Sequence, residues 1–232
     1  KYIADCGFTS RRKAEDLIKQ GKVKVNGAIS SELGVKVDPV KDVVSVDGQV
    51  LDRDSIQRHY ILMNKPRGVM TTLDDPEGRS TVMDYVKEVS ERVYPVGRLD
   101  YLSEGLLLLT NDSDMIKKLN HPRHQSKKIY HVELNKPVSS IHLNKLMSGV
   151  DLDDGKTRVT KAEHVSEGSS REVGIELSSG KTRIINRLFE ALGFSVIKLD
   201  RVSYAGLTKK DLPRGMFRHL TEKEVSFIKM KK

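Results

Sequence analysis

Two apolar runs, at residues 93–96 and 106–109, flank a short segment in which Asp100 directly follows glycine, arginine and leucine. Both runs are brief and are closed by Gly or by Asn-Asp, which is typical of short buried strands. Asp100 is therefore expected on a turn against the core. A carboxylate at such a place loses solvation of its charged form, so it should be paired or used chemically. A structural turn aspartate is the alternative that residue type alone leaves open.

The remainder of residues 58–232 mixes predicted strands and helices irregularly, which indicates an α+β domain. Apolar runs and period-two patterns predict strands at residues 60–63, 69–72, 129–134, 157–165, 172–177 and 194–204. Caps and amphipathic spacing predict helices at residues 81–89, 112–120, 139–147 and 181–192, and a last helix after the capping box at Thr221. Asn64-Lys65-Pro66-Arg67-Gly68 is typical of a loop.

Residues 1–57 form a separate predicted domain, which takes in most of a polar linker at residues 52–58. Ser10 can cap a helix that runs to Gln20. Asn26-Gly27 and Asp47-Gly48 each follow alternating valines and predict two hairpins. Residues 1–25 carry seven Lys or Arg against three Asp or Glu, so the basic charge is concentrated there.

Residues 97–112, read as Gly-Arg-Leu-Asp-Tyr-Leu-Ser-Glu-Gly-Leu-Leu-Leu-Leu-Thr-Asn-Asp, resemble the signature motif of the RsuA/RluB/RluE/RluF family of ribosomal RNA pseudouridine synthases. Asn64-Lys65-Pro66-Arg67-Gly68 and Lys128-Ile129-Tyr130 flank the motif in the family's order. Thr9-Ser10-Arg11-Arg12-Lys13-Ala14 and residues 21–27 resemble the S4 RNA-binding module. The resemblance implies an S4-like domain (1–57) and a catalytic domain (58–232) with a mixed, largely antiparallel sheet flanked by helices.

The resemblance also implies which residues act. Asp100 matches the family's catalytic aspartate and Tyr130 its active-site tyrosine. Isomerisation breaks the C1′–N1 bond of a uridine that has been flipped out of the RNA, turns the uracil and rejoins it through C5. The aspartate acts by attacking the sugar or by stabilising a sugar-derived intermediate, and the sequence leaves both routes open. A tyrosine that only packs in the core remains the alternative for Tyr130.

One position departs from the family pattern. Family members place a basic residue, which pairs with the catalytic aspartate, where this sequence has Asn186. Arg183 lies one helical turn from Arg187 in the predicted helix, so either arginine is a possible ion-pair partner for Asp100. A phosphate or structural contact is the alternative for Arg187.

The formal net charge of +9 favours a polyanionic partner, and ribosomal RNA is the expected one. Solvated lysines and arginines on a helix face are the alternative. The residues expected to contact RNA are Arg11, Arg12, Lys13, Lys22, Lys24, Lys65, Arg67 and Arg98.

Three function classes are weighed: a pseudouridine synthase, a non-catalytic RNA-binding ribosome-assembly factor that retains the synthase fold, and a magnesium-dependent nuclease. The third is disfavoured because the loop carboxylates Asp74, Asp75, Asp84 and Asp114 have no diagnostic ligand spacing. We expect no metal and no cofactor, a monomer, and no membrane association, because no apolar run is long enough to span a bilayer. We also expect a cytoplasmic location and 23S rRNA as substrate, since the long region at residues 157–177 is more like the large-subunit branch of the family.

Overall fold

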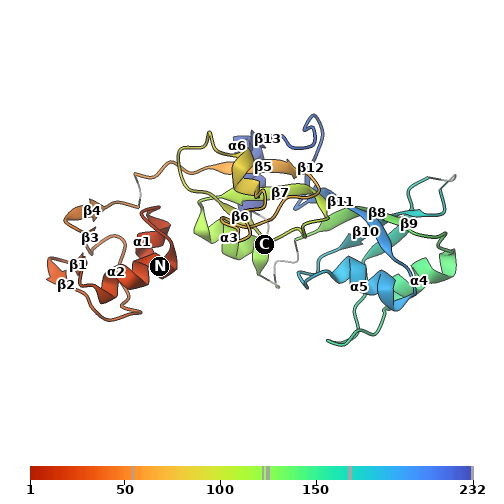
Figure 1. Ribbon diagram of the computed structural model, residues 1–232, viewed down its shortest axis with the longest axis horizontal. Coiled ribbons are helices and arrows are strands. Elements are labelled where there is room, and N and C mark those ends of the chain that lie inside the picture. Colours follow the sequence, from red (N-terminus) through yellow and green to blue (C-terminus); the bar gives the residue numbers. More distant parts are fainter. Residues whose placement is uncertain (54, 122, 124–125, 167–168, 231–232) are drawn as a thin grey trace.

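The computed structural model describes residues 1–53, 55–121, 123, 126–166 and 169–230. A small N-terminal part, red and orange in Figure 1, lies at one end of the molecule and is joined to the larger part by an extended stretch. Asp54, which belongs to the expected linker, lies outside the described residues. Each part contains its own sheet and its own buried core.

The N-terminal part follows the predicted pattern of helix and hairpins. Ser10 caps the second helix by accepting the backbone N–H of Lys13 at 3.2 Å. Asn26 and Asp47 have positive φ angles of 52° and 47°, and each is followed by glycine, which is the turn geometry that joins paired strands. The sheet has the order β2-β1-β3-β4. The elements are α1 (Tyr2–Asp5), α2 (Arg11–Lys19), β1 (Val23–Val25), β2 (Ala28–Ile29), β3 (Val44–Val46) and β4 (Gln49–Leu51).

The larger part is an α+β domain built on a mixed sheet, as predicted. Its strand order is β13-β5-β7-β11-β8-β10-β9, with β6 paired to β7 and β12 paired to β11. The pairing of β7 with β11 is parallel, and the other strand pairs are antiparallel. The strands are β5 (Tyr60–Lys65), β6 (Tyr94–Val96), β7 (Glu104–Thr110), β8 (Lys128–Leu134), β9 (Lys161–His164), β10 (Glu172–Leu177), β11 (Val196–Tyr204), β12 (Leu207–Thr208) and β13 (Phe217–His219). The helices are η1 (Val82–Tyr85, a 3₁₀ turn), α3 (Ser113–Asn120), α4 (Ser140–Ser148), α5 (Ile184–Ala191) and α6 (Glu222–Met230).

Strand β7 is buried along its whole length because both of its faces are covered. Leu107 and Leu109 belong to the core that includes α4 and α5, whereas Leu106 and Leu108 belong to the core that includes α3 and α6. A strand covered on both faces has no polar side, which explains the continuous apolar run in the sequence. The turn that bears Asp100 leads into this rigid strand.

Two predicted elements are absent or reduced. Residues 69–72 form no strand, and Met70 makes only a single bridge to Thr81. The reason is that β5, its expected partner, already pairs with β7 on one edge and β13 on the other. The helix predicted at 81–89 is reduced to η1, which is closed by a capping box between Thr81 and Asp84.

Three predicted boundaries also shift. Asn64 and Lys65 end β5 and do not lie in a loop. The strand expected at 157–165 is confined to β9, since Val159 donates its N–H to Leu146 in α4. The helix expected at 181–192 begins only at Ile184, because Arg183 has a left-handed backbone with φ of 49°.

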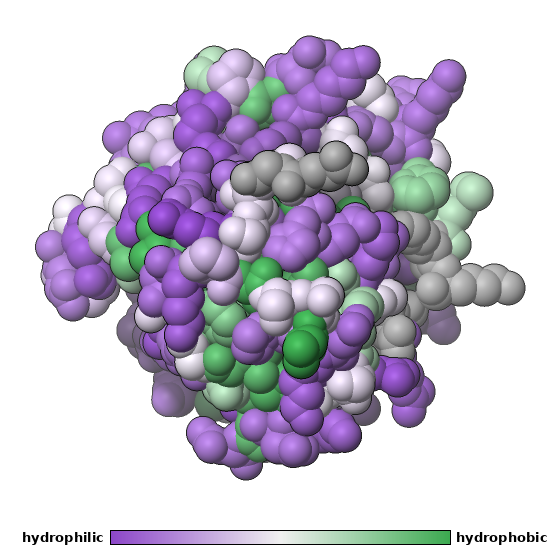
Figure 2. Space-filling view, turned by 90° about the vertical axis from the view of Figure 1, so that its right-hand side faces the viewer, coloured by the Kyte–Doolittle hydropathy of each residue, from purple (hydrophilic) through white to green (hydrophobic). Residues whose placement is uncertain are grey.

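The end of the molecule that carries α4 and β9 is mostly hydrophilic, and its apolar residues form small areas surrounded by polar ones (Figure 2). The apolar residues of α4 and α5, such as Leu146 and Phe189, are packed inward against the sheet. Among the described residues, no helix is both long enough and apolar enough to cross a membrane.

Candidate active site

Asp100 lies on the turn between β6 and β7, and the backbone of this turn is held on both sides of the residue. Gly97 opens the turn with φ of 72°. Leu99 is buried, and its carbonyl oxygen and N–H both bond to the Thr71 hydroxyl, at 2.8 and 3.3 Å. The carbonyl oxygen of Asp100 accepts the N–H of Ser103 at 3.0 Å. These bonds fix the place of the carboxylate without involving it.

The carboxylate itself is exposed. Asp100 lies on the expected turn, and Leu99 packs that turn against the core. The expectation that the carboxylate loses its solvation there is wrong, because Asp100 follows Leu99 on the open side of the turn. In the part of the chain that the structure describes, no ion pair reaches its carboxylate. Water therefore solvates the charge as long as the site is open, so the carboxylate needs a partner only when a ligand displaces that water.

Lys65 lies beneath this turn and holds its backbone by hydrogen bonds. Its side chain is fully buried at the end of β5. Its ammonium donates to the carbonyl oxygens of Ser103 at 2.7 Å, Pro66 at 3.0 Å and Asp100 at 3.2 Å. Burial lowers the pKa of Lys65 to about 8, and the charges of Asp100 and Glu104 act in the opposite direction. The expectation that Lys65 contacts RNA is wrong, because a buried ammonium with three carbonyl partners cannot reach a phosphate.

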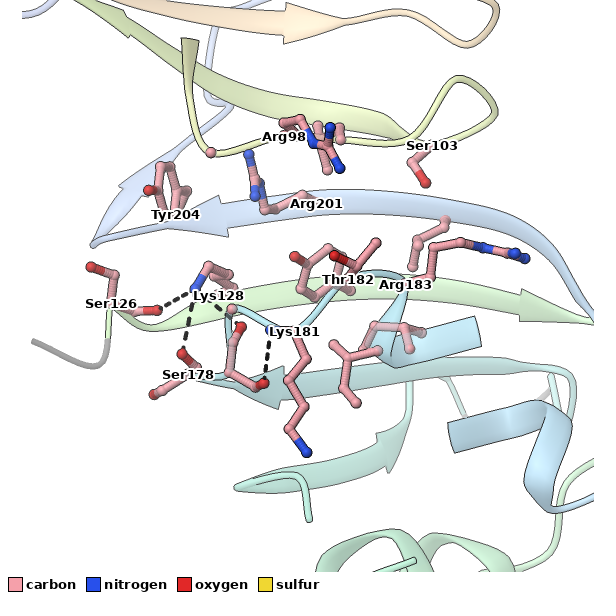
Figure 3. A pocket seen from close by; sticks show the side chains of 18 of the residues that line it. Arg98, Ser103, Ser126, Lys128, Ser178, Lys181, Thr182, Arg183, Arg201 and Tyr204 are labelled. Atoms are coloured by element: carbon pink, nitrogen blue, oxygen red, sulfur yellow. Dashed lines mark hydrogen bonds between the residues drawn. The ribbon is translucent and has the colours of Figure 1, made fainter. Parts of the chain in front are cut away.

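Asp100 lines a cavity of about 1170 Å³ that is large enough for a flipped nucleotide. Its walls come from the turn before β7, the start of β8, the segment that leads into α5, and β11. Figure 3 shows that side chains from these elements converge on the same space. The predicted site residues that line it are Arg98, Asp100, Tyr130 and Arg183, together with Asn186.

Tyr130 forms part of the floor of this cavity. It lies on β8, where the alternating pattern buries it together with Val132 and Leu134 on the face covered by α4 and α5. Its side chain is 8% exposed. A ring that is packed on one side and faces a cavity on the other can stack on a planar base.

Lys128 lies two residues before Tyr130 and also lines the cavity. Its ammonium donates to the carbonyl oxygens of Ser126 at 3.2 Å, Ser179 at 3.3 Å and Ser178 at 3.5 Å, which ties the segment before α5 to β8 (Figure 3). Burial, with a smaller effect of the positive charge of Arg201, lowers the pKa of Lys128 to about 8. Lys128 was not among the residues expected at the site, although the period of a strand places residues 128 and 130 on one face.

The two arginines expected to pair with Asp100 pair with other carboxylates. Arg183 is the N-cap residue of α5, and its carbonyl oxygen accepts the N–H of Arg187 at 3.0 Å, so the two residues are one turn apart as expected. The Arg183 side chain, however, lies 3.6 Å from Glu190. Arg187 binds Asp154 through two bonds of 2.7 and 3.1 Å and is absent from the described lining of the cavity. The hydrogen bonds of Arg187 lower the pKa of Asp154 to about 2. The expected ion pair is therefore wrong for the structure as it stands.

The remaining basic residues expected to contact RNA are exposed and so are accessible to it. Arg98 lies at the cavity, and Arg67 reaches the carbonyl oxygen of Ile197 at 3.3 Å. In the N-terminal part, the expected RNA contacts lie on the first turn of α2 and on or next to β1, and they are Arg11, Arg12, Lys13, Lys22 and Lys24.

Three of the four carboxylates considered as magnesium ligands pair with basic side chains, and Asp74 is exposed on its loop. Asp75 pairs with Arg79, Asp84 with Lys87, and Asp114 with Arg53 and Lys117. Within the described ranges, no group of three or more His, Cys, Asp or Glu residues could hold a metal ion. This arrangement gives no support to a two-metal nuclease site.

Comparison with known proteins shows to which protein families the chain is related. The family model for RNA pseudouridylate synthase matches residues 59–191, and the model for the S4 domain matches residues 1–44. "Ribosomal large subunit pseudouridine synthase B" of Bacillus subtilis is 43% identical over 99% of this chain and 94% of its own length. An "Uncharacterized RNA pseudouridine synthase" of Aquifex aeolicus is 37% identical over 97% of this chain and 91% of its own length. A solved structure described as "Crystal structure of pseudouridylate synthase" is 27% identical and superimposes with a TM-score of 0.68 over 98% of this chain and 97% of that chain.

Proposed function

Because the chain belongs to the family of RNA pseudouridylate synthases and carries an S4 domain, we propose that it isomerises a uridine in the RNA of the large ribosomal subunit. The reaction class follows from the family. The choice of the large subunit is supported by the name of the Bacillus subtilis relative. We further propose that the protein is a cytoplasmic monomer. We also propose that it uses no cofactor, since isomerisation moves one bond and one proton without net redox change or transfer to a second molecule.

Asp100 is the proposed catalytic residue. Its carboxylate lies on a turn whose backbone is fixed by Thr71, Ser103 and Lys65, and it lines the same cavity as Tyr130. A carboxylate held in this way can attack C1′ of a flipped uridine or stabilise the sugar-derived intermediate that forms when the base leaves. This shared cavity is the observation that carries the proposal.

The direct test uses purified protein and large-subunit ribosomal RNA labelled with tritium at C5 of uridine. Rejoining the base through C5 releases the tritium to water, and mass spectrometric mapping then locates the product. We expect tritium release and a pseudouridine at a defined position. Absence of release from protein-free 23S rRNA and from intact large subunits alike would contradict the proposal.

A non-catalytic assembly factor is the alternative that the sequence left open, with Asn186 in its favour. The relatives named as synthases do not favour it. The cavity also keeps a fixed aspartate and a packed tyrosine, and RNA binding alone requires neither.

Tyr130→Phe is expected to keep RNA affinity within about twofold and to slow turnover about 100-fold, if the hydroxyl moves a proton during the reaction. The ring that can stack on the base remains, and only the hydroxyl is lost. The measurement is the single-turnover rate of tritium release beside a filter-binding titration. Tyr94→Phe is the matched control, because Tyr94 lies on β6, where Arg92 packs over its ring, and is absent from the described cavity lining. Equal rates in the two variants would restrict Tyr130 to stacking.

The S4 domain is the proposed RNA anchor, through basic side chains that surround the N-terminus of α2. Phosphates favour a helix N-terminus, where backbone N–H groups are free and the dipole is positive. Arg11 and Arg12 occupy the first two positions of this helix and are exposed. Arg67 and Arg98 are the proposed phosphate contacts nearer the cavity.

Replacing both Arg11 and Arg12 with Gln is expected to weaken RNA binding. The slope of log binding constant against log salt concentration should become shallower by about 1 to 2, because each phosphate contact that is lost releases about one counterion fewer. Binding constants would be measured at several salt concentrations. Replacing Lys36 and Lys41 with Gln removes the same charge from exposed positions of the same domain and is expected to leave the slope nearly unchanged. Equal slopes in the two double variants would show that α2 is not the anchor.

A further inference from the structure

The floor of the cavity contains a buried guanidinium that the function proposed above does not use. Arg201 lies on β11 and is 3% exposed. Its Nε donates to the carbonyl oxygen of Leu106 at 2.7 Å. Its Nη2 is buried and has no hydrogen-bond partner among the described residues, although Arg201 lines the cavity. An unpaired buried donor on a charged group is costly, so a ligand that completes it is the natural explanation.

The position of this guanidinium is fixed from several sides. Arg201 is directly opposite Tyr130 in the pairing of β11 with β8, so both side chains leave the same face of the sheet. The guanidinium lies 4.5 Å from the centre of the Tyr204 ring. On the other side, a Cβ at Gly105 would come within 2.4 Å of the Arg201 carbonyl oxygen, so β7 and β11 are in tight contact. Figure 3 shows Arg201 and Tyr204 projecting from β11 into the space below the segment that carries Arg98.

Among the carboxylates that the structure describes, none forms an ion pair with Arg201. Asp200 binds Lys209 and Arg214, and Glu104 binds Lys198 and Arg214 at 3.2 and 3.4 Å. Lys128 also lines the cavity, so two cationic side chains lie at this end of it, and the charge of Arg201 contributes to lowering the pKa of Lys128. Such a field favours a group on which negative charge develops.

A second unpaired atom narrows the identity of the ligand. Among the described residues, five buried side-chain atoms lack a hydrogen-bond partner, and the two that belong to residues lining the cavity are Nη2 of Arg201 and Oδ1 of Asn186. One is a donor and the other an acceptor. A phosphate offers only acceptors at neutral pH and would leave Asn186 unsatisfied. Uracil offers two carbonyl oxygens and one N–H, so it can satisfy both.

On the basis of the function proposed above, we propose that Arg201 binds a carbonyl oxygen of the flipped uracil and stabilises the base as it leaves the sugar. The phosphates of a flipped nucleotide stay with the chain at the mouth, so the base is the part that reaches the buried floor. When the C1′–N1 bond breaks, its electron pair stays on the uracil and spreads over N1 and the two carbonyl oxygens. Arg201 donates a hydrogen bond to one of these oxygens and transfers no proton. The C5–C1′ bond then forms with electrons of the uracil anion, C5 loses its proton to water and N1 gains one.

Arg201→Met is expected to lower the single-turnover rate of uridine isomerisation by about 100- to 1,000-fold, the usual effect of losing one such donor. Because Arg201 does not touch phosphate, the RNA dissociation constant and its salt slope should stay close to those of the unaltered protein. Arg92→Met removes an exposed arginine outside the described lining and should react at the unaltered rate. A salt slope shallower by about one counterion would instead make Arg201 a phosphate contact and overturn the proposal.

Dependence on the leaving group separates this role from a structural one. Fluorine at C5 withdraws electrons and makes uracil a better leaving group, so RNA with 5-fluorouridine at the target should lose less rate in Arg201→Met than uridine RNA does. Cleavage of its C1′–N1 bond would be followed by mass spectrometry. Equal fold-losses on both RNAs, or rates within threefold of the unaltered protein, would overturn the proposal. If Arg201→Met does not fold, the fold-losses on uridine RNA and 5-fluorouridine RNA are compared for Arg201→Lys, which keeps the charge. A failure of the proposed function is distinct, because the unaltered protein would then release no tritium.

Discussion

Asp100→Asn is expected to lower the rate of pseudouridine formation by at least about 1,000-fold, because an amide has nearly the same shape as a carboxylate but can neither attack C1′ nor stabilise a cationic sugar. The fold should be unaffected. The turn is held by the backbone carbonyl of Asp100 and by Leu99, and the carboxylate itself is exposed. Tritium release from uridine-labelled large-subunit RNA measures the rate, and thermal unfolding checks the fold.

The matched control for this prediction is Asp74→Asn. Asp74 is an exposed carboxylate on a neighbouring loop and was one of the residues weighed as a magnesium ligand. Its replacement should leave pseudouridine formation unchanged. Turnover of more than a few per cent in Asp100→Asn, with the control fully active, would remove Asp100 from the chemistry and leave the family assignment in place.

Lys65→Met is expected to lower the free energy of unfolding by about 3 kcal/mol and to reduce turnover at the same time. Methionine fills a similar volume but cannot donate, so the carbonyl oxygens of Pro66, Asp100 and Ser103 would lose their buried partner. Two of these oxygens belong to the turn that positions the carboxylate. A looser turn is costly, because small displacements of a reacting group lower the rate strongly.

Urea unfolding at pH 7 and single-turnover tritium release test both parts of this prediction. Lys87→Met is the control, since the Lys87 side chain is 75% exposed and pairs only at the surface with Asp84. It should change stability by less than about 0.5 kcal/mol. Full activity with lost stability would show that Lys65 supports the fold without positioning Asp100. Unchanged stability would contradict our account of the buried ammonium.

Local signals in the sequence were sufficient for much of the fold, because they depend on residues a few positions apart. Ser10 caps α2 as predicted, since its side-chain oxygen reaches an N–H group of the first helical turn, and the helix predicted from residue 112 is α3, which Asp112 caps. Asn26-Gly27 and Asp47-Gly48 form the two hairpin turns because these pairs adopt positive φ without strain. The motif that carries Asp100 was likewise found by its order along the chain.

Predictions that required knowledge of distant neighbours failed. Residues 69–72 have the composition of a strand, but both edges of β5 were already taken. Arg187 has the spacing of an ion-pair partner for Asp100, but Asp154 lies closer from another loop. Lys65 stands beside a Pro-Gly turn typical of an exposed loop, yet β5 extends through it and the turn of Asp100 covers it.

The sequence by itself determined the family, the α+β class, the hairpins and capped helices, and the aspartate on its turn. Each of these depends on motifs or patterns of residues that are close together along the chain. Tertiary structure alone decided which charges surround that aspartate. Nothing in the sequence distinguishes Arg201 from other arginines in predicted strands. The register of β11 with β8 places it opposite Tyr130 on the cavity floor. Burial and pairing are properties of neighbours brought together by the sheet, so the sequence could identify the reactive carboxylate but not the groups that act with it.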